Sequence, residues 1–297
     1  MKFNLVYPLL IIIASSSYGI LSTIVKVAMN RGYTSAEATA SQYAIGFLLA
    51  LILFLITQRK LPKLNRTGLL FIVLAGVCTG TTGIVYNQSL NYLPASLAVV
   101  LLFQFTWIGM FIDCFLRKRL PSRSETISLI FLFIGTILAA GIIDVDLSTI
   151  AWQGWAFGLA SALSFAIFIQ FNSRPVEGVT TISRTLIMSF VALVIISLFS
   201  SPEIIWNGQL FGTELLFFGL TLGVFGIILP IVLFSIAAPK VGGGLTSILS
   251  AMELPVAIIA SVLVLRETLT ILQVIGIVLV IVGMVLPTVL AQKKTSV

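Results

Sequence analysis

An acidic side chain deep inside an apolar segment is the clearest chemical feature of this sequence. Glu253 lies twelve residues into the apolar run 241–265. At 1.5 Å per residue, that is roughly 18 Å from the start of a helix and near the centre of a bilayer. An ionised carboxylate costs a few kcal/mol at that depth, so it must be protonated, hydrated or hydrogen-bonded. Two roles stay open: proton coupling or binding of a substrate amine, and capping of backbone groups freed by Pro255.

Two further charged residues lie within apolar runs. Lys26 is roughly 31 Å from the start of the run 5–29. It can pair with a substrate carboxylate or with Glu253 as part of a coupling site, but extension of its ammonium group to the outer interface is the simpler expectation. Asp113 lies four residues before Arg117, so a structural ion pair on one helix face is expected there.

The sequence contains few of the residues that catalytic and metal-binding sites require. The chain contains no histidine, which excludes Ser-His-Asp and Cys-His catalysis and histidine-ligated metals. Its two cysteines, Cys78 and Cys114, lie in separate apolar runs without CxxC spacing. The acids Asp144 and Asp146 stand alone on a loop. We therefore expect no enzymatic activity, no metal site and no cofactor.

Polar and aromatic side chains recur in several apolar runs and suggest a central pocket. Helix packing through small residues explains any single member, whereas the set favours a cavity in which rings hold apolar parts of a solute and hydroxyls or amides orient its polar end. The predicted pocket residues are Tyr18, Thr82, Tyr86, Gln104, Trp107, Ser164, Phe168 and Glu253.

Two short connections are candidates for gates. The run Gly242, Gly243 and Gly244 follows Pro239 but lacks the Lys-Ser/Thr ending of a phosphate-binding loop, so nucleotide binding is not expected. Flexible glycines at a tight hairpin suit a gate on one side of the membrane, paired with Tyr92 and Pro94 on the other. A purely structural turn is the alternative.

Composition and the length of the apolar runs predict the helices that position these residues. The 297 residues are 59% hydrophobic and only 9% charged, with a mean hydropathy of +1.15, which indicates lipid as the main solvent. The apolar runs are continuous and about twenty residues long, as in membrane helices and unlike barrel strands. The sequence predicts an all-α integral membrane protein with ten spans near 5–29, 36–57, 68–91, 95–116, 124–143, 151–172, 182–201, 213–237, 241–265 and 269–290.

Basic residues give the orientation, because Lys and Arg favour cytoplasmic loops. Fourteen of the 17 lie in alternate loops or the two tails, only Arg31 and Arg266 lie in the other loops, and Lys26 lies within a span. Both termini are therefore expected in the cytoplasm, and the net charge of +7 needs no nucleic-acid partner. The first seventeen residues resemble a signal peptide, but the apolar stretch continues past Ser17, so cleavage is not expected.

The ten spans divide into two sets of five. An odd number of spans places the second set in the opposite orientation, so residues 1–145 and 146–297 are predicted to form inverted repeats. A shift of 149 residues supports this weakly, since it lays Gln104-Phe105-Thr106 over Glu253-Leu254-Pro255 and Leu116-Arg117 over Leu265-Arg266.

The same residues resemble a known family. The motifs that carry the resemblance are Glu253-Leu254-Pro255, Leu265 to Thr270, Gln273, Gly276, Gly283 and the upstream hairpin Ser89 to Ser96. Together they look like the EamA repeat of the drug/metabolite transporter superfamily, over essentially the whole chain. In the first repeat, Gln104 and Thr106 stand where the pattern has Glu and Pro, and Lys118-Arg119 stands where it has Glu. A carboxylate that binds a proton or a substrate is therefore expected only in the second repeat. Gln42-Tyr43 stands near a place where many members have Arg.

The resemblance implies a secondary transporter of the cytoplasmic membrane that works by alternating access. It implies a small metabolite as substrate, often an amino acid or a related compound, usually moved outward. Proton coupling through Glu253 and simple facilitated diffusion both stay open. The alternatives are an exporter of lipophilic or quaternary cations, and a channel or a non-transporting membrane sensor. Substrate identity and oligomeric state are open.

Overall fold

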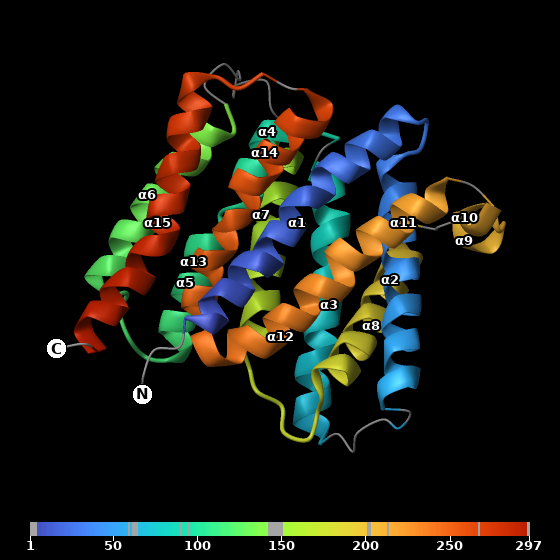
Figure 1. Cartoon of the computed structure of the whole chain (residues 1–297), viewed down its shortest axis with the longest axis horizontal. Coiled ribbons are helices and arrows are strands. Elements are labelled where there is room, and N and C mark those ends of the chain that lie inside the picture. The colour runs from blue at the N-terminus through green and yellow to red at the C-terminus, as the bar shows by residue number, and fades with distance from the viewer. Residues whose placement is uncertain are drawn as a thin grey trace.

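The computed structural model describes residues 5–58, 60, 65–89, 91–93, 95–141, 151–200, 203–212, 214–266 and 268–295. Within these ranges the regular structure is helical and no strand occurs. The first half contains α1 (Val6–Asn30), α2 (Ser35–Thr57), α3 (Arg66–Ser89), α4 (Ala95–Leu102), α5 (Phe105–Leu116) and α6 (Arg123–Ala139). The second contains α7 (Trp152–Asn172), α8 (Thr181–Ser200), the short α9 (Glu203–Trp206) and α10 (Gln209–Gly212), α11 (Leu215–Gly223), α12 (Leu229–Val241), α13 (Gly243–Leu249), α14 (Glu253–Leu265) and α15 (Ile271–Thr295). The helices form one bundle in which α1 begins and α15 ends on the same side (Figure 1).

The prediction of an all-helical membrane protein is confirmed. Nine helical stretches in the described part of the chain are long and apolar enough to cross a membrane, with α4 and α5 joined, α11 and α12 joined, and α13 and α14 joined. The tenth, α6, has 17 residues, or roughly 26 Å, slightly less than a hydrocarbon core of about 30 Å. It ends before the expected residue 143 because Gly141 adopts a φ of +66°, the left-handed conformation that terminates helices.

Local sequence explains where two of the helices begin. Thr34 and Glu37 form a capping box at the start of α2, and Ser122 and Glu125 form the same motif at the start of α6. In each, the hydroxyl accepts a hydrogen bond from the backbone N–H of the glutamate, whose carboxylate accepts from the backbone N–H of the capping residue. These bonds satisfy donors that a helix start would otherwise leave unpaired.

Three spans are interrupted near the middle of the bundle. A π-helical segment, Val224–Ile228, separates α11 from α12. It precedes Pro230, which has no N–H to donate to the carbonyl of Gly226. A turn at Phe103 and Gln104 separates α4 from α5, and a 3₁₀ turn, Ser250–Met252, separates α13 from α14. Interrupted helices at membrane depth are typical of binding sites in transporters.

The two halves pack on each other in a symmetrical pattern. In the first half α1 packs on α12 and α14, and its counterpart α7 packs on α3 and α5. Likewise α2 packs on α11, and its counterpart α8 packs on α3. The remaining large contacts join counterparts directly: α6 with α15, α5 with α13 and α2 with α8. Most of the large contacts are kept when the halves are exchanged, the α5–α13 contact being an exception, so the bundle has approximate pseudo-twofold symmetry.

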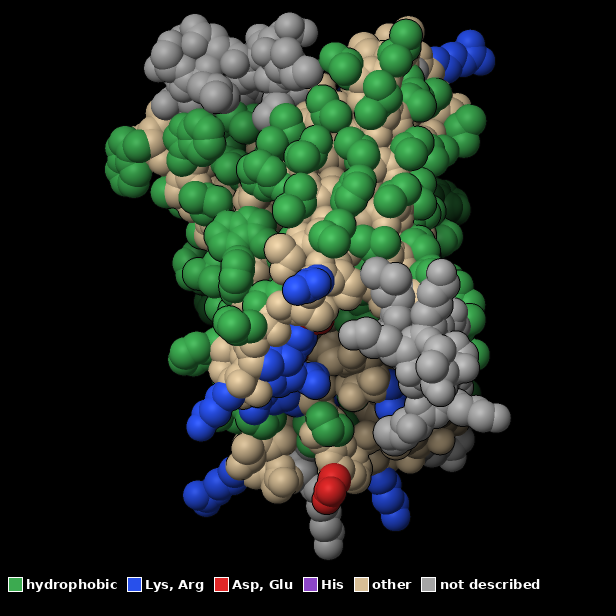
Figure 2. All heavy atoms as spheres, turned by 90° about the vertical axis from the view of Figure 1, so that its left-hand side faces the viewer, with side chains coloured by type: hydrophobic (Ala, Val, Ile, Leu, Met, Phe, Trp, Pro, Cys, Tyr) green, Lys and Arg blue, Asp and Glu red, His purple; other side chains and the backbone are tan. Residues whose placement is uncertain are grey.

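The outer surface is suited to lipid. Large apolar side chains such as Phe115, Leu263 and Ile271 are more than three-quarters exposed, which water would disfavour for a patch of this extent. Figure 2 shows a broad band of hydrophobic side chains on the face that α6 and α15 contribute, with Lys and Arg side chains gathered below it. A hydrophobic band with a basic end matches the charge pattern expected of a membrane protein.

Candidate functional site

Glu253 is the first residue of α14 and follows the 3₁₀ turn directly. Pro255, two residues later, has no N–H to donate to the carbonyl of Ala251, so the helix cannot run unbroken through this point. The carboxylate therefore lies at the N-terminus of a half-helix, where the helix dipole favours negative charge. Of the two roles that the sequence left open for Glu253, capping of backbone groups freed by Pro255 requires an interruption at this point, and a 3₁₀ turn does precede the acid.

The surroundings of Glu253 come from the first half of the chain. Tyr18 of α1 and Tyr86 of α3 lie within electrostatic range of its carboxyl group. A Cβ added to Gly19 would collide with the Glu253 backbone carbonyl, so α1 and α14 touch at this glycine. No hydrogen bond or ion pair of the Glu253 side chain occurs within the described ranges. The side chain caps no backbone group there, and its carboxylate is available to a ligand or a proton.

Aromatic rings form one side of this region. The ring of Tyr18 stacks on Phe234 at a centroid distance of 6.0 Å and meets Phe165 edge-on at 6.1 Å. Phe165 in turn contacts Phe105 at 4.7 Å and Phe168 at 5.6 Å. The five rings come from α1, α5, α7 and α12, so this cluster joins both halves beside Glu253. Rings in these arrangements offer faces and edges to apolar or cationic parts of a solute.

The predicted pocket residues fall into two groups. Tyr18, Tyr86 and Glu253 come together as described above. Ser164 donates a hydrogen bond to the carbonyl of Cys78 at 3.0 Å, and Thr82 donates to the same carbonyl at 2.7 Å, so both hydroxyls join the contact of α7 with α3. Phe168 is a fully buried member of the aromatic cluster.

Gln104 and Trp107 form a separate local pair. The Trp107 indole N–H donates to the Gln104 side chain, whose amide donates to the carbonyl of Val100 at 2.8 Å. Trp107 is 38% exposed and contacts the exposed Phe111 edge-on. No hydrogen bond joins this pair to Glu253 among the described residues. Gln104 therefore supports the α4–α5 break rather than the surroundings of the acid.

Lys26 lies farther along α1. It is exposed and seven residues beyond Gly19, which corresponds to roughly 10 Å along the helix. Its position near the end of α1 agrees with the expected extension toward the interface.

Sequence reasoning missed several residues of the site. Phe105 and Phe234 complete the aromatic cluster. Tyr43 of α2 donates a hydrogen bond to the carbonyl of Thr79 at 3.1 Å, beside the Thr82 turn of α3. Phe105 lies between two residues of the aligned motif, which is a usable signal, whereas Phe234 is one apolar residue among many in its span.

The glycine connection packs on a partly buried ion-pair network. Gly242 joins α12 to α13 with a φ of +90°, and a Cβ there would lie 2.6 Å from the Arg117 guanidinium. Asp113 accepts hydrogen bonds from Arg117 at 2.9 Å and from Arg119 at 3.1 Å. Hydrogen bonds to Glu125 and Asp113 raise the pKa of Arg119 above its usual value despite its partial burial, so this arginine keeps its charge.

The other glycines of this turn are equally constrained. A Cβ on Gly243 would collide with the side chain of Gln170, which donates to the carbonyl of Gly109 at 2.7 Å. A Cβ on Gly244 would lie 2.9 Å from an Asp113 carboxylate oxygen. The backbone of the turn therefore packs against side chains of α5 and α7 so closely that no larger residue fits at these positions.

Of the second predicted gate, Tyr92 and Pro94, the structure describes only Tyr92. Tyr92 stacks on Phe157 at 5.9 Å, and Leu93 fills the space beside Gly154 of α7. Pro94 lies outside the described residues. No group of three side chains able to hold a metal ion occurs in the part of the chain that the structure describes.

Two halves that pack on each other, with interrupted spans and a carboxylate at one of the interruptions, are typical of membrane transporters. The model of the EamA-like transporter family matches residues 5–141 and 152–289. The chain belongs to this family, and its two repeats confirm both the family resemblance and the fold class expected from the sequence. It is a multi-pass membrane transporter and not an enzyme.

Individual relatives agree with this assignment. The threonine/homoserine exporter RhtA of Escherichia coli strain K12 is 24% identical over 261 residues, covering 87% of this chain and 83% of RhtA. RhtA of strains CFT073 and O157:H7 gives the same values. A solved structure described only as a crystal structure of a protein matches with a TM-score of 0.71 and 14% identity over 97% of both chains. The fold is therefore shared over nearly the full length.

Proposed function

We propose that this protein is a secondary transporter that exports an amino acid or a related small metabolite across the cytoplasmic membrane by alternating access. The substrate binds near the midplane, with its amine close to Glu253 and its apolar part against the ring cluster of Tyr18. Residues 1–145 and 146–297 act as the inverted repeats, and both termini lie in the cytoplasm. The similarity to RhtA supports amino acids as the first substrates to test.

The observation that carries this proposal is the unpaired carboxylate at a helix break between the halves. Glu253 begins α14, and the residues around it, Tyr18 and Tyr86, belong to the other half. A ligand held between them therefore contacts both halves at once. Relative movement of the halves exposes such a site to one side of the membrane and then to the other.

The two hairpins supply the moving parts. On the basic end, the turn from Gly242 to Gly244 packs on α5 and α7. On the opposite end, Tyr92 packs on α7. Loss of one set of contacts and formation of the other would open and close the pathway around the fixed site.

Counterflow in proteoliposomes tests the proposal. Purified protein is reconstituted with unlabelled threonine or homoserine inside and the labelled solute outside, with and without a pH gradient. We expect saturable exchange in the native protein and a loss of pH dependence in Glu253→Gln. Glu214→Gln is the matched control, because Glu214 is an exposed acid paired with Arg31 at 3.2 Å, and it should transport as the native protein does.

The outcomes separate the alternatives. Exchange that keeps its pH dependence in Glu253→Gln would refute proton coupling at this residue. Flux without saturation or counterflow would indicate a channel. Absence of exchange for amino acids, from protein shown to be folded, would refute the proposed substrate class. Quaternary cations, which suit an acid flanked by aromatic rings, would then be tested.

A further inference from the structure

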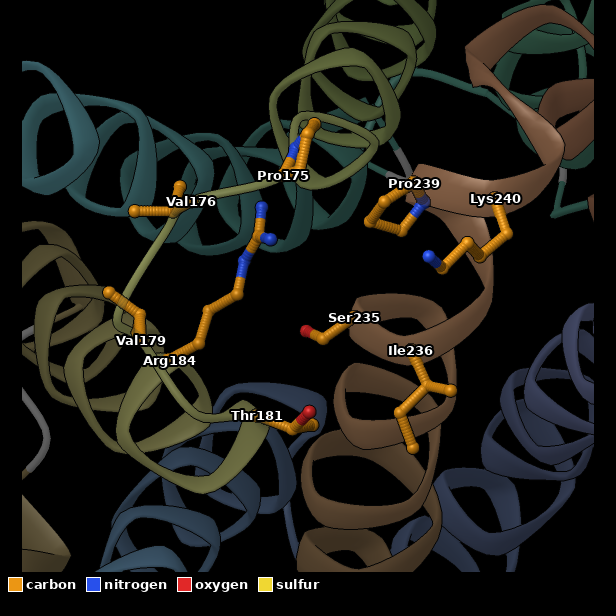
Figure 3. A pocket seen from close by; sticks show the side chains of 9 residues that line it. All are labelled: Pro175, Val176, Val179, Thr181, Arg184, Ser235, Ile236, Pro239 and Lys240. Carbon is orange, nitrogen blue, oxygen red and sulfur yellow. The ribbon is translucent and has the colours of Figure 1, made fainter.

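A cavity lies between α8 and α12, and Glu253 is not among the residues that line it. It has a volume of about 190 Å³ and is bounded by the α7–α8 connection, the start of α8 and the end of α12. Figure 3 shows Arg184 extending from α8 and Lys240 from α12 toward the space between the two helices, with Ser235 and Thr181 on its wall. None of these residues belongs to the transport site proposed above.

Arg184 brings a buried positive charge to this cavity. Only 5% of the residue is exposed. One guanidinium nitrogen donates to the carbonyl of Arg174 at 3.1 Å and another to that of Phe171 at 2.9 Å, while Nε has no partner. Both acceptors are neutral, and no carboxylate within the described ranges pairs with Arg184. A buried charge without a counter-ion is costly unless a ligand supplies one.

Two further features favour an anion at the same place. Lys240 lies in the last turn of α12 and is exposed, and no described carboxylate pairs with it. Thr181 begins α8, a helix of 20 residues. The Ser183 N–H donates to the Thr180 hydroxyl and the Arg184 N–H to the Thr180 carbonyl, which leaves the first-turn N–H groups of Thr181 and Ile182 for a ligand. The positive end of the α8 dipole adds to the two side-chain charges. Glu177, the acid of the neighbouring connection, is exposed and does not line the cavity.

The size of the cavity limits the ligand. A cavity of about 150 Å³ holds one benzene molecule, so a volume of about 190 Å³ accommodates a small molecule. Valine, proline and isoleucine side chains form the rest of the wall, and an apolar wall strengthens electrostatic attraction by lowering the local dielectric constant.

We propose that this cavity is a binding site for a small oxyanion, a carboxylate or phosphate group, held by Arg184, Lys240 and the N-terminus of α8. Because Lys240 lies two residues before Gly242, a bound anion bridges α8 to the helix that leads into the glycine turn. The oxyanion comes either from a soluble compound or from a lipid headgroup, since both carry the same chemistry.

Calorimetric titration tests the site with inorganic phosphate as the probe. The full-length protein is placed in nanodiscs of zwitterionic lipid, where phosphate should bind saturably. Lys240→Gln should weaken binding by roughly three- to tenfold, the effect of losing one charge-assisted contact at a partly solvated site. Lys118→Gln is the matched control, because Lys118 is exposed in the α5–α6 connection and lies outside the cavity. It should bind phosphate as the native protein does.

A second variant addresses the buried arginine. Arg184→Lys keeps the positive charge but removes Nε and the planar fork, so it should weaken phosphate binding even though the protein remains folded by circular dichroism and gel filtration. Absence of saturable binding in the native protein would overturn the proposal. Equal weakening by Lys240→Gln and Lys118→Gln would also overturn it, because the effect would then reflect general charge.

Lipid composition distinguishes the two sources of the oxyanion. In nanodiscs that contain phosphatidylglycerol, a headgroup in the cavity should compete with phosphate and lower its apparent affinity in the native protein but not in Lys240→Gln. Unchanged phosphate affinity in these nanodiscs would assign the site to a soluble anion. Because no substrate is present, this result does not depend on the outcome of the transport assay.

Discussion

Asp113 and Glu253 both lie on membrane-spanning helices, but in the part of the chain that the structure describes only the carboxylate of Asp113 is paired with basic side chains. Asp113 is 4% exposed and accepts hydrogen bonds from two arginines. Glu253 has no such partner among the described residues, and Tyr18 and Tyr86 lie within electrostatic range of its carboxyl group. Paired buried charges hold a structure together, and unpaired ones are costly unless they serve a ligand or a proton. The contrast supports a structural role for Asp113 and the transport role proposed for Glu253.

The architectural role of Asp113 predicts a loss of stability in Asp113→Asn. The amide cannot compensate the charges of Arg117 and Arg119, which converge on this carboxylate. Because Arg117 is half-exposed, we expect a cost of about 1–3 kcal/mol, less than for a fully buried pair. Thermal unfolding in detergent should show a lower midpoint.

Glu214→Gln provides the comparison for this measurement. Its partner Arg31 and Glu214 itself are both more than 60% exposed, and exposed pairs contribute at most about 1 kcal/mol. Its unfolding midpoint should stay close to that of the native protein. A midpoint for Asp113→Asn as high as that of Glu214→Gln would show that the network at the glycine turn does not stabilise the fold.

At the scale of elements, the α4–α5 and α13–α14 breaks occupy matching positions in the two repeats. Different residues cause the two breaks. In α13–α14 the break follows from Pro255. In α4–α5 no proline is present, and Gln104 and Thr106 bond instead to the carbonyls of Val100 and Phe103. Side-chain bonds to the backbone compete with helical hydrogen bonds and permit a turn. The geometry of a broken span is therefore present in both halves, although only one half supplies an acid.

This difference predicts the behaviour of Pro255→Ala. Alanine restores an N–H that can bond to the carbonyl of Ala251, so a continuous helix through Glu253 becomes favourable. We expect thermal stability to be unchanged or higher and counterflow to be slower, because Glu253 loses its place at a helix start. Thr106→Ala is the comparison in the other repeat. Native counterflow rates in Pro255→Ala would show that the break is not needed for transport.

The sequence predicts the spans better than the contacts between them. Continuous apolar runs locate the helices to within a few residues, since a bilayer imposes both length and polarity. The α4–α5 break was not predicted, because Gln104 and Thr106 are not helix breakers by type. The neighbours of Glu253 come from α1 and α3, and no spacing along the chain relates them to α14. The Arg184 cavity was missed for the same reason, since its walls come from α8 and α12.

At the scale of the whole molecule, the halves depend on each other. The largest contacts join one half to the other, as in α1 with α12 and α14, whereas neighbours along the chain such as α2 and α3 touch little. Figure 1 shows helices from both ends of the chain interleaved throughout the bundle. Neither half alone buries the surfaces that its helices present to the other, and a solute held between the halves therefore acts on the main interface of the protein.

This packing predicts how the chain responds to division. Fragments 1–145 and 146–297, divided in the connection between α6 and α7, should each be unstable when expressed alone, because helices without their partners expose small and polar residues to lipid. Expressed together, they should assemble and be purified through a tag on either one. The counterflow of the assembled pair should resemble that of the intact protein, since the division leaves every described contact between helices in place. A fragment that is stable and monomeric by itself would contradict the interlocked arrangement, because the surfaces that join the halves would then tolerate exposure to lipid.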